Sequence, residues 1–157
     1  MSATKASASV PDTLVVVDTY AFSHVFVRGS GSRVRDLRER LRGRIPVIAI
    51  QTQAELLAWP RLQGWGATRA ASLVDLVSAT TTVPVSNDVV AAYVDLLVAC
   101  RSTGHALHQK VHATDRWVAA TAIALDRPLL SLDGVYAAAP GLRLLLPPGD
   151  PVGDRLP

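Results

Sequence analysis

The apolar residues of this chain fall into short runs, separated by longer stretches in which apolar positions recur with a helical period. The runs at 14–17 (LVVV), 46–50 (PVIAI) and 128–132 (PLLSL) are typical of strands covered on both faces of a parallel sheet. Briefer runs at 81–85 and 142–146 predict two further strands.

Prolines and helix-capping residues set the boundaries of the predicted helices. The residue before a proline is pushed out of the helical region, so the last predicted helix must stop before Pro128. Ser86 or Asn87 is placed to cap the longest helix, and Trp59-Pro60 indicates a turn. The predicted helices cover residues 33–42, 51–59, 67–78, 88–102 and 114–126.

Buried strands that alternate with helices predict an α/β fold, a three-layer α/β/α sandwich around a mostly parallel central sheet. A chain of 157 residues has the size of one ordinary domain. We expect that domain to cover residues 12–147, with a flexible arm at 1–11 and a loose tail at 148–157.

From the composition we expect a cytoplasmic protein with no membrane partner. No stretch approaches the roughly 20 apolar residues of a membrane span, and the first residues do not resemble a signal peptide. Cys100 is the single cysteine, so the chain has no internal disulfide, which fits a reducing compartment. It lies on the apolar face of the helix at 88–102, where it is expected to pack in the core.

Positive charge is concentrated in one segment. The net charge is only +3, yet seven arginines and two acidic residues lie between Arg28 and Arg44. Guanidinium groups pair with phosphates and carboxylates, so this segment is either a binding surface or an ordinary solvated helix face. The candidate contacts to RNA or to a protein partner are Arg35, Arg38 and Arg42.

Four acidic residues occupy positions that point toward one edge of the predicted sheet. Asp18 and Asp133 directly follow strands, Asp115 opens a helix, and Glu55 lies about one turn into the helix after the second strand. Ligands bind beyond the carboxyl ends of parallel strands, so we expect the four side chains to converge there. Taken singly, the aspartates also fit ordinary turns or a helix N-terminus.

Crowded carboxylates favour a hard divalent cation. Their mutual repulsion raises their pKa values unless a cation neutralises them, and Mg²⁺ and Mn²⁺ prefer oxygen ligands. Such an ion can activate water and stabilise the leaving oxygen of a phosphodiester. Zinc is disfavoured, because His108 and His112 lack the glutamate of H-E-x-x-H and a third ligand nearby. The chain also lacks the hydrolase-elbow, P-loop and dinucleotide motifs.

Three segments, LVVVDTYAF, IAIQTQAELLAW and TGHALHQKVHATDRWVAATAIALDRPLLSLDGVYAAAPGL, resemble the PIN-domain ribonucleases, specifically the VapC-type toxins of bacterial toxin–antitoxin pairs. The resemblance covers residues 13–146. It implies a PIN-like fold, cleavage of RNA that depends on Mg²⁺ or Mn²⁺, inhibition by a VapB-type antitoxin, and a homodimer. It also implies that the metal-binding and catalytic residues are Asp18, Glu55, Asp115 and Asp133.

The resemblance also marks positions around those acids. Thr19 and Thr52 match places where the family has small hydroxyl or polar residues near the metal. Thr114 stands where many relatives have an asparagine, which alters a hydrogen bond beside the third acid. The segment 134–136 replaces a more usual polar pair before an aromatic residue, so an additional ligand is missing there.

Two other classes of function remain open. One is a catalytically inactive PIN-like module that binds RNA or a protein partner. The other is a receiver-like signalling domain, although the acidic pair near the first strand and the lysine after the last strand are missing. Metal-dependent RNA cleavage would distinguish the enzyme from both.

Overall fold

The computed structural model describes residues 12–145, with the side chain of Arg28 left out. The predicted arm at 1–11 and tail at 148–157 lie outside these residues, so both stay predictions. Within the described part, every helix is too short or too polar to span a lipid bilayer.

Four parallel strands form the central sheet, in the order β3-β2-β1-β4. Val16 of β1 pairs with Val47 of β2 on one side and with Leu129 of β4 on the other. The strands are β1 (Leu14–Val17), β2 (Ile45–Ala49), β3 (Thr81–Val83) and β4 (Leu129–Leu130).

Helices connect each pair of consecutive strands. Between β1 and β2 lie α1 (Thr19–Phe22), the π-helix η1 (Ser23–Arg28) and α2 (Ser32–Leu41). Between β2 and β3 lie α3 (Ile50–Leu62) and α4 (Ala67–Ala79). The segment between β3 and β4 contains α5 (Asn87–Thr103), the short helices η2 (Ala106–His108) and η3 (Lys110–His112), and α6 (Ala113–Leu125). The short helix η4 (Gly134–Tyr136) follows β4.

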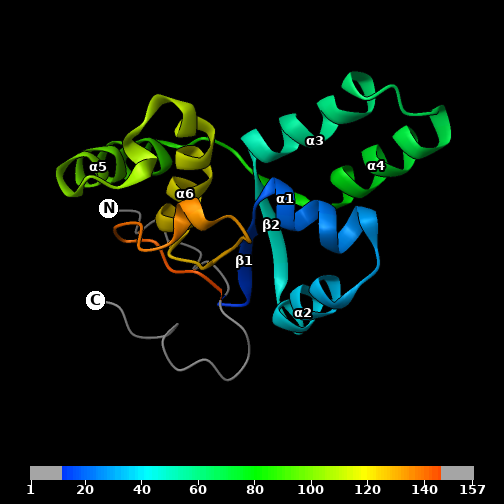
Figure 1. Cartoon of the computed structure of the whole chain (residues 1–157), viewed down its shortest axis with the longest axis horizontal. Helices are drawn as coiled ribbons and strands as arrows, with labels where there is room; N and C mark the ends of the chain where they lie inside the picture. Colours follow the sequence, from blue (N-terminus) through cyan, green and yellow to red (C-terminus); the bar gives the residue numbers. More distant parts are fainter. Residues whose placement is uncertain (1–11, 146–157) are drawn as a thin grey trace, which may run out of the picture.

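The two faces of the sheet carry separate apolar cores, because successive strand side chains point to opposite faces. Val15 and Val17 pack with α1, α2, α3 and α4 on one face. Val16 packs with α5 and α6 on the other, where Cys100 is also buried as expected. Figure 1 shows these two helical layers on either side of β1 and β2. The predicted three-layer α/β/α sandwich is confirmed.

The order of the strands reverses beside β1. From β1 the chain builds β2 and β3 on one side, and it then returns to place β4 on the other side. The backbone N–H of Asp18 donates to the carbonyl of Leu130 at 3.2 Å, which joins the carboxyl ends of β1 and β4. Such a reversal opens a crevice beyond the strand ends, where ligands of α/β sheets bind.

The structure differs from the sequence prediction at a few positions, where tertiary packing determines the local backbone conformation. Pro60 lies inside α3 and is buried, although Trp59-Pro60 was expected to form a turn. A proline beyond the first turn removes one backbone hydrogen bond of its helix, and here the burial of the ring offsets that cost. The predicted strand at 142–146 is reduced, within the described residues, to a single bridge between Leu129 and Leu144.

Candidate functional site

Asp18 stands where β1 ends and α1 begins. Its Oδ1 accepts a 2.7 Å hydrogen bond from the backbone N–H of Ala21, which caps α1. Its Oδ2 accepts a hydrogen bond from the hydroxyl of Ser131, which follows β4. With only 5 % of the residue exposed, both oxygens are held in a fixed position at the reversal point.

Burial is the main cause that raises the pKa of Asp18, to about 6. The hydrogen bonds from Ser131 and Ala21 act in the opposite direction, and the negative charges of Asp133 and Asp115 raise the pKa further. Asp133 and Asp115 therefore lie close enough to Asp18 to act on it electrostatically.

Asp115 lies in the first turn of α6 and is contacted through both of its oxygens. His112 Nδ1 is 2.9 Å from Oδ2, and the hydroxyl of Tyr136 donates to Oδ1 at 3.4 Å. Burial, followed by the charges of Asp115, Asp18 and Asp133, raises the pKa of Tyr136 far above its ordinary value. Its hydroxyl therefore remains protonated, which makes it a hydrogen-bond donor facing the acids.

Asp133 is exposed and begins η4. Its Oδ1 accepts from the backbone N–H of Val135 at 2.9 Å, and its own N–H donates to Oγ of Ser131 at 3.0 Å. Ser131 therefore connects Asp18 and Asp133. Sequence reasoning missed Ser131, considered His112 only as a disfavoured zinc ligand, and noted Tyr136 only within a departure from the family pattern. A hydroxyl two residues before Asp133 was the available indication for Ser131.

Glu55 is linked to the other candidate acids through a different contact. The hydroxyl of Thr19, the residue after Asp18, donates to the Glu55 carboxylate. The structure thus brings Asp18, Asp115 and Asp133 together, and it attaches Glu55 through Thr19. Of the other hydroxyl candidates, Thr52 is fully buried and its Oγ1 has no hydrogen-bond partner among the described residues, whereas Thr114 is exposed.

The donor atoms suit a hard divalent cation, because they are carboxylate and hydroxyl oxygens. Burial and, to a smaller extent, repulsion from Asp133 and Asp115 raise the pKa of Asp18, and a cation here would offset both by stabilising the carboxylate. In residues 12–145, however, no three His, Cys, Asp or Glu side chains are arranged to hold a metal ion. Each of the four carboxylates instead accepts a hydrogen bond from, or pairs with, a protein group.

The family model that matches the chain is that of the PIN domain, over residues 15–142. The chain belongs to the PIN domain family. This confirms the family to which the sequence pointed. No curated protein matches the chain in sequence.

Solved structures share the fold of this PIN domain. One is the structure of VapBC2 from Rickettsia felis bound to a DNA fragment from the VapBC2 promoter. It has a TM-score of 0.69 at 17 % identity and covers 83 % of this chain and 96 % of that chain. FitAcB from Neisseria gonorrhoeae has a TM-score of 0.62 at 20 % identity, covering 80 % and 92 %. VapBC-5 of the VapBC toxin–antitoxin family, from Mycobacterium tuberculosis, has a TM-score of 0.61 at 19 % identity, covering 85 % and 98 %.

The arginines predicted to contact RNA or a partner differ in what they contact in this PIN domain. Nη2 of Arg38 donates to the carbonyl of Val25 at 3.1 Å. Arg42 forms a 2.7 Å ion pair with Glu39. Arg35 is exposed to solvent. Their contacts to RNA or to a partner stay predictions.

Proposed function

We propose that this PIN domain is a metal-dependent endoribonuclease that hydrolyses RNA phosphodiester bonds, and that it is the toxin of a VapBC-type toxin–antitoxin pair. The observation that carries the proposal is the grouping of Asp18, Asp115 and Asp133 at the point where the strand order reverses. The lone buried Cys100 suits a reducing compartment, so we place this activity in the cytoplasm.

In this proposal the residues that hold Mg²⁺ or Mn²⁺ are Asp18, Glu55, Asp115 and Asp133. When bound by these residues, such an ion would supply an activated water and charge stabilisation for the leaving oxygen. The surrounding residues orient the ligands: Ser131 and the N–H of Ala21 fix Asp18, and Thr19 fixes Glu55. Their contacts decide the direction in which each carboxylate presents its remaining lone pairs.

The decisive experiment replaces Asp18 and measures cleavage of structured RNAs in Mg²⁺, in Mn²⁺ and in chelator. Asp18→Asn is expected to abolish metal-dependent cleavage while circular dichroism shows a native fold. Asp95→Asn, which changes an exposed acid on α5, is the matched control and should cleave normally. Full activity in Asp18→Asn would contradict the proposal. RNA binding without cleavage by the native protein would support the inactive module instead.

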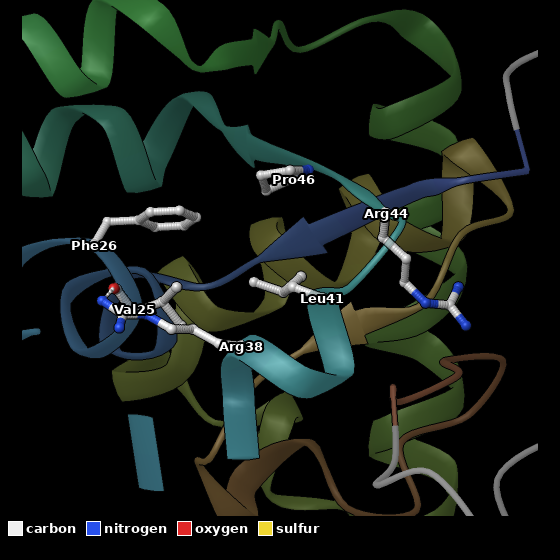
Figure 2. A pocket seen from close by; sticks show the side chains of 6 residues that line it. All are labelled: Val25, Phe26, Arg38, Leu41, Arg44 and Pro46. Atoms are coloured by element: carbon white, nitrogen blue, oxygen red, sulfur yellow. Dashed lines mark hydrogen bonds between the residues drawn. The ribbon is translucent and has the colours of Figure 1, made fainter. Parts of the chain in front are cut away.

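The proposed protein partner is a VapB-type antitoxin. A concavity of about 340 Å³ lies between η1, α2 and the start of β2, with apolar side chains and two arginines around it. Figure 2 shows Phe26, Leu41 and Pro46 near one another, Arg38 beside Val25, and Arg44 extending away. An antitoxin segment with bulky apolar and acidic side chains suits this surface. Copurification of a small partner with the native protein, and its loss in Phe26→Asp, would test this docking surface.

A further inference from the structure

A second pocket, of about 310 Å³, has one of the four candidate acids, Asp133, in its lining. Its lining residues come from three separate parts of the chain: Tyr20 from α1, Arg33 from α2, and Leu132 and Asp133 from the segment after β4. Asp133 therefore belongs both to this pocket and to the group of acids. A ligand seated in the pocket lies next to the place where the proposed reaction occurs.

Tyr20 offers an aromatic surface that is 45 % exposed. Its ring packs against that of His24 in a tilted arrangement, with the centroids 4.2 Å apart and the ring planes at 40°, and His24 Nδ1 is 2.9 Å from the Tyr20 carbonyl. The ring is therefore held in place although much of it faces solvent. Exposed aromatic rings of this kind are the surfaces on which unpaired bases stack.

Arg33 is placed where its charge does not stabilise its own helix. It lies in the first turn of α2, where the helix dipole disfavours a cation. Among the described residues Arg33 has no ion-pair partner, whereas Arg40 pairs with Asp36 and Arg42 with Glu39. An exposed guanidinium at this position is available to an anionic ligand, and a phosphate binds it in bidentate fashion.

We propose that the pocket formed by Tyr20, Arg33, Leu132 and Asp133 binds one unpaired nucleotide of the substrate, next to the phosphate that the acids cleave. The base stacks on Tyr20, the phosphate pairs with Arg33, and Leu132 forms an apolar wall. This inference rests on the proposed ribonuclease function and adds which side chains hold the nucleotide, namely the ring of Tyr20 and the guanidinium of Arg33. The base must leave its helical stack to enter a pocket of this size.

The test measures binding of a fluorescent single-stranded RNA oligonucleotide in chelator, at several salt concentrations, in an Asp18→Asn background that does not cleave. Stacking contributes about 1–3 kcal/mol per base, so Tyr20→Ala should weaken binding by roughly 5- to 150-fold, while Tyr20→Phe should bind normally. Arg33→Gln should weaken binding and reduce the salt slope by about 0.7, the value for one phosphate contact on a single strand.

The matched control is Arg101→Gln, which removes an equal charge from an exposed site on α5. It should leave affinity and salt slope unchanged. The same oligonucleotide annealed to its complement should bind more weakly, and Tyr20→Ala should not weaken it further.

The two proposals fail in different ways. If the native protein cleaves RNA but Tyr20→Ala and Arg33→Gln bind like Arg101→Gln, the nucleotide pocket is overturned and the ribonuclease function stands. If the native protein does not cleave RNA in either metal, the ribonuclease function fails whatever the binding data show. Equal affinity for single-stranded and duplex RNA also overturns the pocket.

Discussion

The residue that most changes the picture of the site is Tyr136. It is 2 % exposed, and its hydroxyl donates to Oδ1 of Asp115 while His112 contacts the other oxygen. Both oxygens of Asp115 are thus fixed from the protein side. A carboxylate held in this way presents its remaining lone pairs in a defined direction, which is how residues behind a metal ligand influence affinity.

Tyr136→Phe removes the hydroxyl and keeps the ring in the core. We expect the affinity for Mn²⁺, measured by calorimetry, to fall by about 10-fold or more, as is typical when a hydrogen bond to a metal ligand is lost. The control is Tyr93→Phe, whose hydroxyl accepts from Arg116 and contacts none of the four acids. Unchanged Mn²⁺ affinity in Tyr136→Phe would mean that the hydroxyl does not orient Asp115.

Asp18 makes stability depend on pH. Its pKa is about 6 in the folded protein against 3.8 for an unperturbed carboxyl, so the folded state holds a proton that the unfolded state releases. The contribution of Asp18 to the free energy of unfolding is therefore fully present below pH 3.8, and it is lost as the pH rises through about 6. At 1.36 kcal/mol per pKa unit the loss is on the order of 3 kcal/mol.

Urea unfolding in chelator at pH 4.5 and pH 8 measures this loss. Asp18→Asn should gain stability relative to the native protein as the pH rises, because the amide carries no charge. Asp95→Asn should follow the native protein at both values. Mg²⁺ added at pH 8 should remove much of the difference, since a cation neutralises the buried carboxylate. A difference between Asp18→Asn and native protein that does not change with pH would rule out the buried charge as its cause.

At the scale of elements, the sequence predicted what depends on local pattern. The apolar run at 14–17 coincides with β1, and the cap at Ser86 is present, with its Oγ accepting from Val89 N–H at 3.3 Å. Pro60 within α3 was missed, because tertiary burial overrides the local preference of proline. Packing also decides which face of α3 is covered: Leu56 is buried, whereas Ala54 and Leu57 are exposed.

The same distinction between local sequence pattern and tertiary packing applies to the residues of the site. Asp18, Asp115 and Asp133 could be located at one edge, because each position follows from the end of a strand or the start of a helix. Ser131 was indicated only by its hydroxyl two residues before Asp133, and the contact of Tyr136 was not indicated at all. Both contacts depend on how the segment after β4 lies against Asp18 and Asp115. Arg33 was not distinguished from its neighbours for a similar reason, because only the packing of α2 shows which arginine reaches the pocket.

At the scale of the whole molecule, three candidate binding surfaces lie on different parts of the protein. The candidate acids and the pocket that contains Asp133 lie at the carboxyl ends of the strands, and the apolar concavity of Figure 2 lies by the start of β2. The third is a stripe on α5 formed by Val90, Val94 and Val98, spaced four residues apart and between 41 % and 63 % exposed. Residues with this spacing share one helix face. The opposite face of α5 is already buried against the core.

The homodimer implied by the family stays a proposal, and the α5 stripe is the surface that would form it. Val94→Asp puts a charge in the middle of the stripe and should convert a dimer to a monomer in light scattering at micromolar concentration. Val74→Asp, on the exposed face of α4, is the control and should leave the mass unchanged. All four acids come from a single chain, so the monomeric variant should still cleave RNA at a rate close to that of the native protein. A dimer that survives Val94→Asp would place the interface elsewhere, and loss of cleavage on dissociation would show that the site depends on the second copy.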